Sequence, residues 1–71
     1  MTERELEAAC AGVGERTINL YADLCAKIPK AIVVTGMTGG LAACAVEAGF
    51  DRDKVVAAIN SAFDDILTPA E

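Results

Sequence analysis

The 71-residue sequence contains no histidine and no tryptophan, and its aromatic residues are one tyrosine and two phenylalanines. Histidine is the side chain most often used for general acid–base catalysis and for binding metals, so its absence removes the usual residue for both. The sequence also shows no nucleophile motif and no metal-ligand spacing. We therefore predict no catalytic residue, no metal site and no cofactor, and expect that the protein is not an enzyme.

Cysteine is present only as three widely spaced residues, Cys10, Cys25 and Cys44. An odd number at this spacing indicates neither a disulfide framework nor a zinc cluster, and we expect each cysteine to be a small core residue. The N-terminal segment MTERELEAAC mixes acids with bases and is not followed by the apolar run of a signal peptide. Together with unpaired thiols, this predicts a cytoplasmic protein.

Basic residues are also few, six against eleven acids, which gives a formal charge of −5. Nucleic-acid binding needs clustered lysine and arginine, whereas these six are scattered, so no nucleic-acid partner is expected. A chain this short buries only about 60% of the surface that its unfolded form exposes. Because disulfides and metals are poorly provided for, self-association is the expected supplement to the core.

Apolar periodicity predicts an all-α fold of three sequential helices, over about 2–28, 30–48 and 52–67, in one domain over 1–71. Thr2 and Glu5 have the spacing of a capping box at the start of the first helix. The apolar phase persists across Gly12 and Gly14, which favours a continuous or slightly bent helix over a broken one. Pro29 disfavours helical geometry at the residue before it, so the first helix should end near residue 27 or 28.

The boundary between the second and third helices is marked by four residues. Gly49 suits the left-handed position after a helix, and Phe50 can pack back onto the last turn. Asp51 is a suitable N-cap, and Phe50 and Val55 have the spacing of a hydrophobic staple. The connections are two to three residues long, which predicts that sequential helices are antiparallel neighbours in a small bundle. We expect oligomerisation to complete this bundle.

The segment 31–46 carries no charge, although the rest of the chain is rich in charge. Such a segment is too uniformly apolar for one face of a surface helix, so something must cover it. We interpret it as a central helix whose small residues recur every four positions and allow a second copy of the chain to pack closely. The predicted oligomer interface consists of Gly36, Met37, Gly40, Leu41, Cys44 and Ala48.

Two other interpretations of this segment concern a loop and a membrane. If the glycines formed a loop, its amides and a following helix N-terminus could bind an anion. The candidate ligand-binding residues are then Lys30, Thr35, Gly36, Thr38, Gly39 and Gly40.

A membrane span is not expected, because sixteen uncharged residues rich in glycine, threonine and alanine fall below the roughly 20 apolar residues that a span requires.

The sequence IVVTGMTGGLA over residues 32–42 resembles the first strand and glycine turn of the short-chain dehydrogenases. The resemblance implies a strand at 31–35 and a pyrophosphate site at the following helix N-terminus. A helix is expected before the motif, however, and 29 residues follow it, which leaves no room for a parallel sheet. The family's tyrosine–lysine pair also has no downstream counterpart, since Tyr21 precedes the motif. We therefore expect a helix here.

These observations predict a small, soluble, all-α homo-oligomer, most simply a homodimer. Its expected function is to bind another protein as an adaptor, inhibitor or regulator. The alternative is a protein that binds or sequesters a small anionic ligand, such as a nucleotide, at a subunit interface near residues 35–40. The sequence does not identify either partner.

Overall fold

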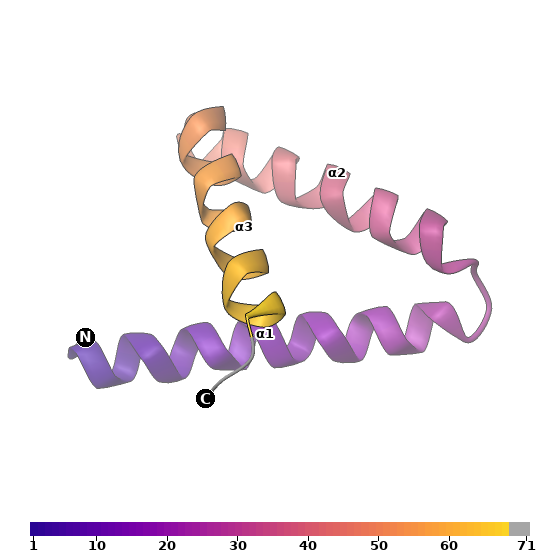
Figure 1. Cartoon of the computed structure of the whole chain (residues 1–71), viewed down its shortest axis with the longest axis horizontal. Helices are drawn as coiled ribbons and strands as arrows, with labels where there is room; N and C mark the ends of the chain where they lie inside the picture. The colour runs from indigo at the N-terminus through magenta and orange to yellow at the C-terminus, as the bar shows by residue number, and fades with distance from the viewer. Residues whose placement is uncertain (69–71) are drawn as a thin grey trace. The chain divides into compact units, whose positions relative to one another are not determined.

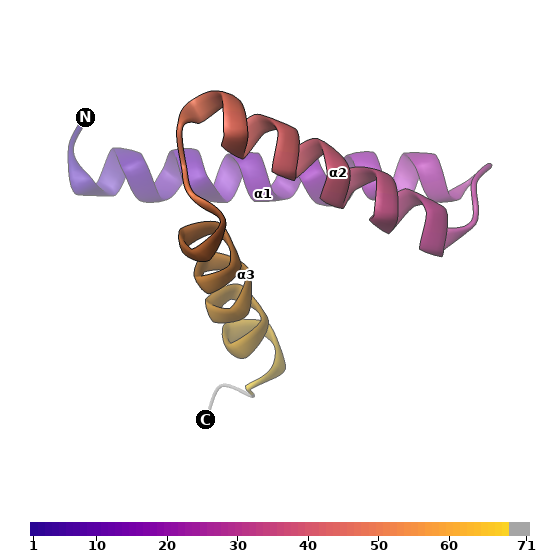
Figure 2. The same cartoon turned by 90° about the horizontal axis from the view of Figure 1, so that it is seen from above.

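A computed structural model describes residues 1–68 of the chain and contains three α-helices in this range. They are α1 (Glu3–Cys25), α2 (Lys30–Ala48) and α3 (Arg52–Leu67), drawn in Figures 1 and 2. No strand occurs in the described range. The predicted all-α class is confirmed, as are the bounds predicted for the second and third helices.

The start of α1 is fixed by the predicted capping box. The amide of Glu5 donates to the Thr2 hydroxyl at 3.2 Å, and the amide of Thr2 donates to the Glu5 carboxylate at 3.5 Å. Each bond satisfies an amide that has no partner within the first turn of a helix. The helix then continues without a break through Gly12 and Gly14, as predicted.

The end of α1 differs from the prediction, because the helix ends at Cys25 instead of near residue 28. The chain beyond it forms a tight turn, in which the amides of Lys27 and Ile28 donate to the carbonyl of Leu24 at 3.1 and 2.9 Å. Pro29 restricts the residue before it to extended geometry. The helix therefore unwinds over its last turn, several residues before the proline.

The whole of the glycine-rich segment is helical. The carbonyl of Pro29 accepts from the amides of Ile32 and Val33 at 3.0 and 3.1 Å, which starts α2 directly after the proline. The Thr35 hydroxyl donates to the Ala31 carbonyl at 2.7 Å, a bond that threonine makes readily inside a helix. A strand at 31–35, a loop at 35–40 and the dehydrogenase-like turn are therefore all wrong for this chain.

The end of α2 has the hydrogen bonds of a Schellman motif. The amide of Phe50 donates to the carbonyl of Ala45 at 3.0 Å, and the amide of Gly49 donates to that of Val46 at 3.2 Å. Gly49 has a φ of +84°, which a residue with a side chain rarely adopts. The predicted role of Gly49 is confirmed.

The start of α3 follows directly from this turn. The Asp51 carboxylate accepts from the amide of Lys54 at 3.2 Å, so Asp51 is the predicted N-cap. Phe50, just before the cap, and Val55, in the first turn of α3, line a common pocket, consistent with the predicted staple. The chain therefore reverses within three residues, each with a separate local role.

The chain divides into two compact units, residues 1–37 and the residues from Thr38 onward. The first unit contains α1 and the beginning of α2, and its buried residue is Val33, which is 4% exposed. Its half-buried side chains include Tyr21, Leu24, Cys25 and Met37. The second unit contains the remainder of α2 and α3, with Ala45, Val55 and Ile59 half-buried. The single domain over 1–71 stays a prediction, and its last three residues lie outside the described range.

The cysteines do not form part of a core within this chain. Cys10 and Cys44 are exposed and Cys25 is only half-buried. The expectation that each is a small core residue is therefore wrong for the single chain. The reason is the small number of buried positions, since Val33 alone among residues 1–68 is buried.

Candidate interaction surfaces on α2 and α3

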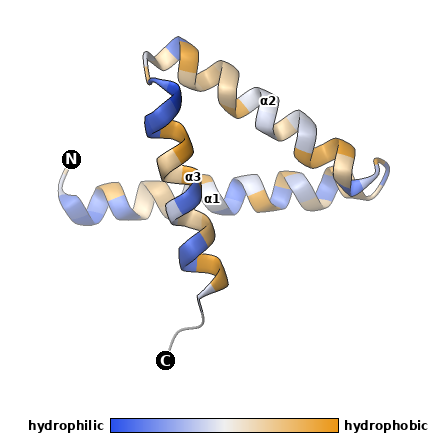
Figure 3. Cartoon of the chain, turned by 45° about the horizontal axis from the view of Figure 1, so that its top comes forward, coloured by the Kyte–Doolittle hydropathy of each residue, from blue (hydrophilic) through white to orange (hydrophobic). Residues whose placement is uncertain are grey.

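Helix α2 is apolar or uncharged on every side. No charged residue lies between Lys30, the first residue of the helix, and Glu47, the last but one. In Figure 3, α1 and α3 alternate between hydrophilic and hydrophobic residues, whereas the interior of α2 ranges from pale to hydrophobic. Val33 is nevertheless the one buried residue of α2. The helix therefore presents to solvent a surface that water solvates poorly.

The structure places the six predicted interface residues along this continuous helix. Five of them are exposed, and Met37 is half-buried. Apart from the backbone of α2 itself and the adjacent residues, no atom of residues 1–68 lies within 4 Å of the position that a Cβ would take at Gly36 or Gly40. The predicted interface is thus open to another molecule. The six residues are Gly36, Met37, Gly40, Leu41, Cys44 and Ala48.

The glycines in the interior of α2 have open surroundings among the residues that the structure describes. A glycine in a helix interior costs about 1 kcal/mol relative to alanine. Such a cost is commonly offset where another backbone approaches closely, but no atom from another element of residues 1–68 lies within 4 Å of the Cβ position at Gly36, Gly39 or Gly40. Their open surroundings leave room for an approach from outside the chain.

The candidate ligand-binding residues lie in the same helix. Lys30 is its first residue, and Gly36, Gly39 and Gly40 lie in its interior, where backbone amides donate to the preceding turn. The Thr35 hydroxyl donates to Ala31, and Thr38 also has an interaction partner. Residues 35–40 therefore do not form the loop of free amides on which an anion site was expected to depend. Ligand binding by these six residues stays a prediction.

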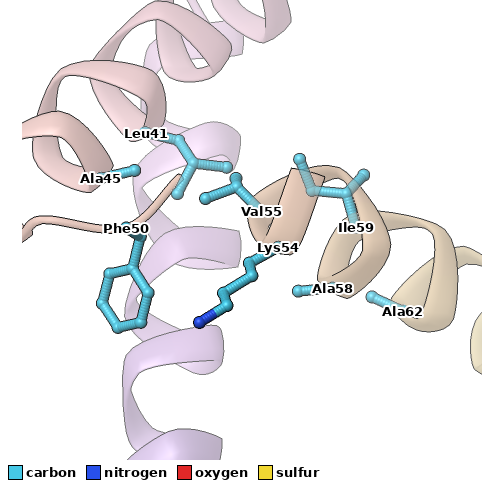
Figure 4. A pocket seen from close by; sticks show the side chains of 8 residues that line it. All are labelled: Leu41, Ala45, Phe50, Lys54, Val55, Ala58, Ile59 and Ala62. Atoms are coloured by element: carbon cyan, nitrogen blue, oxygen red, sulfur yellow. The ribbon is translucent and has the colours of Figure 1, made fainter. Parts of the chain in front are cut away.

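A pocket that sequence reasoning missed lies within the second unit. It is an open pocket of about 450 Å³, within the range of small-molecule sites, and is lined almost entirely by apolar side chains. Phe50 and Lys54 flank one side of it in Figure 4. The staple spacing of Phe50 and Val55 was the signal that could have located it. The lining residues are Leu41, Ala45, Phe50, Lys54, Val55, Ala58, Ile59 and Ala62.

Helix α3 carries charged residues near both of its ends. Its first turn contains the bases Arg52 and Lys54 and also the acid Asp53, and its last turn contains no base. Asp64 and Asp65 lie near its C-terminal end. None of these five side chains forms an ion pair within residues 1–68. Their charges are therefore available to another molecule.

Tyr21 and Cys25 form a local pair on consecutive turns of α1. The hydrogen bond with Cys25 raises the pKa of Tyr21 above its usual 10.0, and partial desolvation and the charge of Cys25 act in the same direction. The i, i+4 spacing in α1 is the cause of this proximity. The pair provides a spectroscopic signal for this part of the chain, as the one tyrosine absorbs without interference from tryptophan.

Comparison of the chain with known protein families, with characterised proteins and with solved structures finds no match to any of them. Within residues 1–68, no group of three or more potential ligands is arranged to hold a metal ion.

Helix α2 also passes a length and composition test for a membrane span. Its 19 residues exceed the sixteen uncharged residues on which the sequence argument against a span was based. The core helix of a soluble protein can have the same length and composition. These two properties therefore fit a helix surrounded by lipid as well as a helix packed against protein. The expected absence of a membrane partner stays a prediction.

Proposed function

We propose that this chain is a small helical protein that self-associates through α2 and acts by binding another protein, as an adaptor, inhibitor or regulator. The observation that carries the proposal is the mismatch between the composition and the burial of α2. The helix is uncharged from Ala31 to Val46, yet Val33 is its one buried residue. A cytoplasmic location accompanies the proposal, since all three cysteines are unpaired.

The exposed surface of α2 favours association on energetic grounds. Ile32, Val34, Leu41 and Val46 are 62, 52, 46 and 78% exposed. Ile32 and Val46 lie on one side of α2, and Val34 and Leu41 lie on another. Burial of apolar surface contributes roughly 25 cal/mol per Å² removed from water, so a contact that covers one of these pairs would contribute a few kcal/mol. A small chain that buries little of its own surface gains proportionally more from association than a large one.

The geometry of the small residues favours a second copy as the first partner. Gly36, Gly40, Cys44 and Ala48 recur at i+4 and so follow one side of α2. Two such sides can approach more closely than sides with large residues, and a two-fold axis would bring the same residues together from both copies. Leu41 would then pack at the edge of the contact.

Binding of an anionic small molecule near residues 35–40 is the alternative function. Lys30 in the first turn of α2 could contribute a positive charge, and that turn contains no acid. A thermal shift assay with a panel of nucleotides and inorganic phosphate tests this alternative. Stabilisation by one of these compounds, lost in Lys30→Ala, would support it.

The proposal is tested by co-purification of differently tagged copies and by pull-down from the native host. Gly40→Leu places a large side chain in the predicted interface, while Gly14→Leu makes the same change in α1, also with nothing within 4 Å. We expect the unmodified chain and Gly14→Leu to retain a second copy and the same host protein. Gly40→Leu should lose the second copy. Retention by all three baits would contradict the role of α2.

Binding to liposomes tests the alternative that α2 is embedded in lipid and not packed against protein. If α2 instead spans or enters a membrane, the unmodified protein should float with neutral vesicles and should resist extraction by salt. The proposal expects the protein to stay in the aqueous fraction at concentrations where it self-associates.

A further inference from the structure

The pocket of the second unit lies in the corner where the chain passes from α2 to α3. Leu41 and Ala45 lie one helical turn apart on α2, and Phe50 comes from the turn between the helices. Val55 and Ile59 lie one turn apart on α3. Every lining residue belongs to the second unit, so the pocket is built by a single compact part of the chain.

Small side chains leave this corner open. Ala58 and Ala62 lie one turn apart on α3 and line the pocket together with Ala45 of α2. A methyl group cannot fill the space between two diverging helices as a larger side chain would. The volume of about 450 Å³ lies toward the lower end of the range typical of small-molecule sites, which suits a short ligand.

The lining indicates that the body of the ligand is apolar. Lys54 is the one lining residue that is not apolar. A nucleotide base or a sugar would lose hydrogen bonds to water against the other side chains without gaining new ones. Phe50 and Leu41 are 60 and 46% exposed, so a chain of CH₂ groups laid against them would remove apolar surface from water on both sides of the contact.

The charge of Lys54 indicates that one end of the ligand is an anion. Its amine lies on the same side of the pocket as the Phe50 ring (Figure 4) and forms no ion pair within residues 1–68. The Asp51 carboxylate accepts from the backbone amide of Lys54 at 3.2 Å, as the cap of α3. Asp53 lies about 100° around the helix from Lys54, on the side away from Val55. The pocket therefore has one positive charge at its edge and no acid in its lining.

A single cation in an acidic chain suits a ligand with a single negative charge. The formal charge of the chain is −5, so a ligand with several negative charges would be repelled by the rest of the molecule. A carboxylate carries one charge and accepts charge-assisted hydrogen bonds from an ammonium group.

We propose that this pocket binds a medium-chain fatty acid, with the alkyl chain against Phe50 and Ile59 and the carboxylate paired with Lys54. The site goes beyond the proposed function, because it takes a ligand and does not depend on a second copy of the chain. It also differs from the anion site considered at residues 35–40, with which it shares no residue.

Calorimetric titration with hexanoate, octanoate and decanoate, each below its critical micelle concentration, tests the ligand class. Each further CH₂ group that the pocket covers should tighten binding by up to about fourfold, so decanoate should bind most tightly. Decyltrimethylammonium has the same chain with a positive head group and should bind about tenfold more weakly, since an exposed attraction becomes a repulsion of similar size. Absence of saturable decanoate binding, or equal binding of the cation, would overturn the proposal.

The role of Lys54 is tested by removing its charge. Lys54→Met keeps an unbranched apolar side chain and should weaken decanoate binding about three- to fivefold, the effect of an exposed ion pair. Lys27→Met makes the same change of charge outside the pocket and should leave the affinity unchanged. Equal affinities of these two variants would overturn the pairing of the carboxylate with Lys54.

The position of the alkyl chain is tested by filling the pocket. Ala58→Leu places a larger side chain in the lining and should weaken decanoate binding at least about tenfold, and Ala62→Leu is a second variant of the same kind. Ala57→Leu, at the adjacent position of α3 but outside the lining, is the matched control. Circular dichroism should show equal helix content in all three. Undiminished binding by both lining variants would overturn the pocket as the site.

Gly40→Leu separates the pocket from the proposed function. Residue 40 does not line the pocket, although its neighbour Leu41 belongs both to the lining and to the predicted α2 interface. We expect Gly40→Leu to bind decanoate as tightly as the unmodified chain, whether or not it self-associates. Loss of decanoate binding together with self-association would overturn a pocket formed by one chain. Retained binding in a chain that proves monomeric would overturn the α2 interface and leave the pocket standing.

Discussion

The amide of Phe50 donates a hydrogen bond to the carbonyl of Ala45 at 3.0 Å, across a left-handed Gly49. This bond ends α2 and brings Phe50 to the pocket that Ala45 also lines. The next residue, Asp51, already caps α3. The chain reversal that builds the second unit therefore depends on a few adjacent residues, which makes it accessible to single substitutions.

Gly49→Ala should lower the stability of the protein. The φ of +84° costs an alanine about 1–2 kcal/mol, although nothing lies within 4 Å of its Cβ position. Gly39→Ala is the matched control, because Gly39 lies in a helix interior with equally open surroundings, and alanine there should stabilise by up to about 1 kcal/mol. Chemical denaturation followed by circular dichroism measures both. Equal effects of the two substitutions would contradict the assigned conformation of Gly49.

Asp51→Ala should also destabilise, by about 1 kcal/mol, since the amide of Lys54 loses its acceptor. Asp51→Asn should keep most of the stability, because asparagine caps helices about as well. The free energies of unfolding of the two variants, taken from denaturation curves, separate the loss of the cap from the loss of the negative charge. If asparagine were as harmful as alanine, the lost charge and not the cap would be responsible.

Tyr21 should titrate above its usual pKa of 10.0, chiefly because of its hydrogen bond with Cys25. A pKa raised in the folded state means that the folded protein holds the phenol proton more tightly than the unfolded chain does. The associated stability is fully present below pH 10 and is lost as the pH rises through the folded pKa. Near-ultraviolet absorbance measures the titration of the single tyrosine directly.

Cys25→Ala provides the comparison for Tyr21. Without the thiol, the pKa of Tyr21 should fall toward 10.0, and the loss of stability should begin at lower pH. Cys10→Ala, on the same helix and exposed, should leave the titration unchanged. Identical titration curves for all three proteins would show that Cys25 does not act on Tyr21 in solution.

Local signals in the sequence predicted most of the fold. The capping box of Thr2 and Glu5, the left-handed Gly49 and the cap at Asp51 each rest on side-chain chemistry within four residues, and each is confirmed. The end of α1 was predicted less well. Pro29 predicts the point beyond which the helix cannot continue. It does not predict how many residues earlier the helix ends.

The surfaces were less predictable than the helices. Apolar residues recur along α3 at helical spacing, a pattern typical of a buried side. The structure nevertheless leaves Phe63, Ile66 and Leu67 exposed, because burial depends on what packs against the helix and not on the period alone. The same reason explains why the prediction for Cys10 and Cys44 failed. The staple spacing of Phe50 and Val55 predicted that these two side chains lie close together, but it did not predict how far α2 and α3 diverge beside them, so the pocket was missed.

Sedimentation equilibrium of the unmodified chain and of Gly40→Leu over a range of concentrations tests the central claim most directly. We predict that the unmodified chain associates reversibly into dimers or larger oligomers, and that Gly40→Leu associates at least about tenfold more weakly, because its side chain prevents close approach at α2. A chain that sediments as a monomer at all concentrations in aqueous buffer would contradict the claim, as would equal association of both proteins.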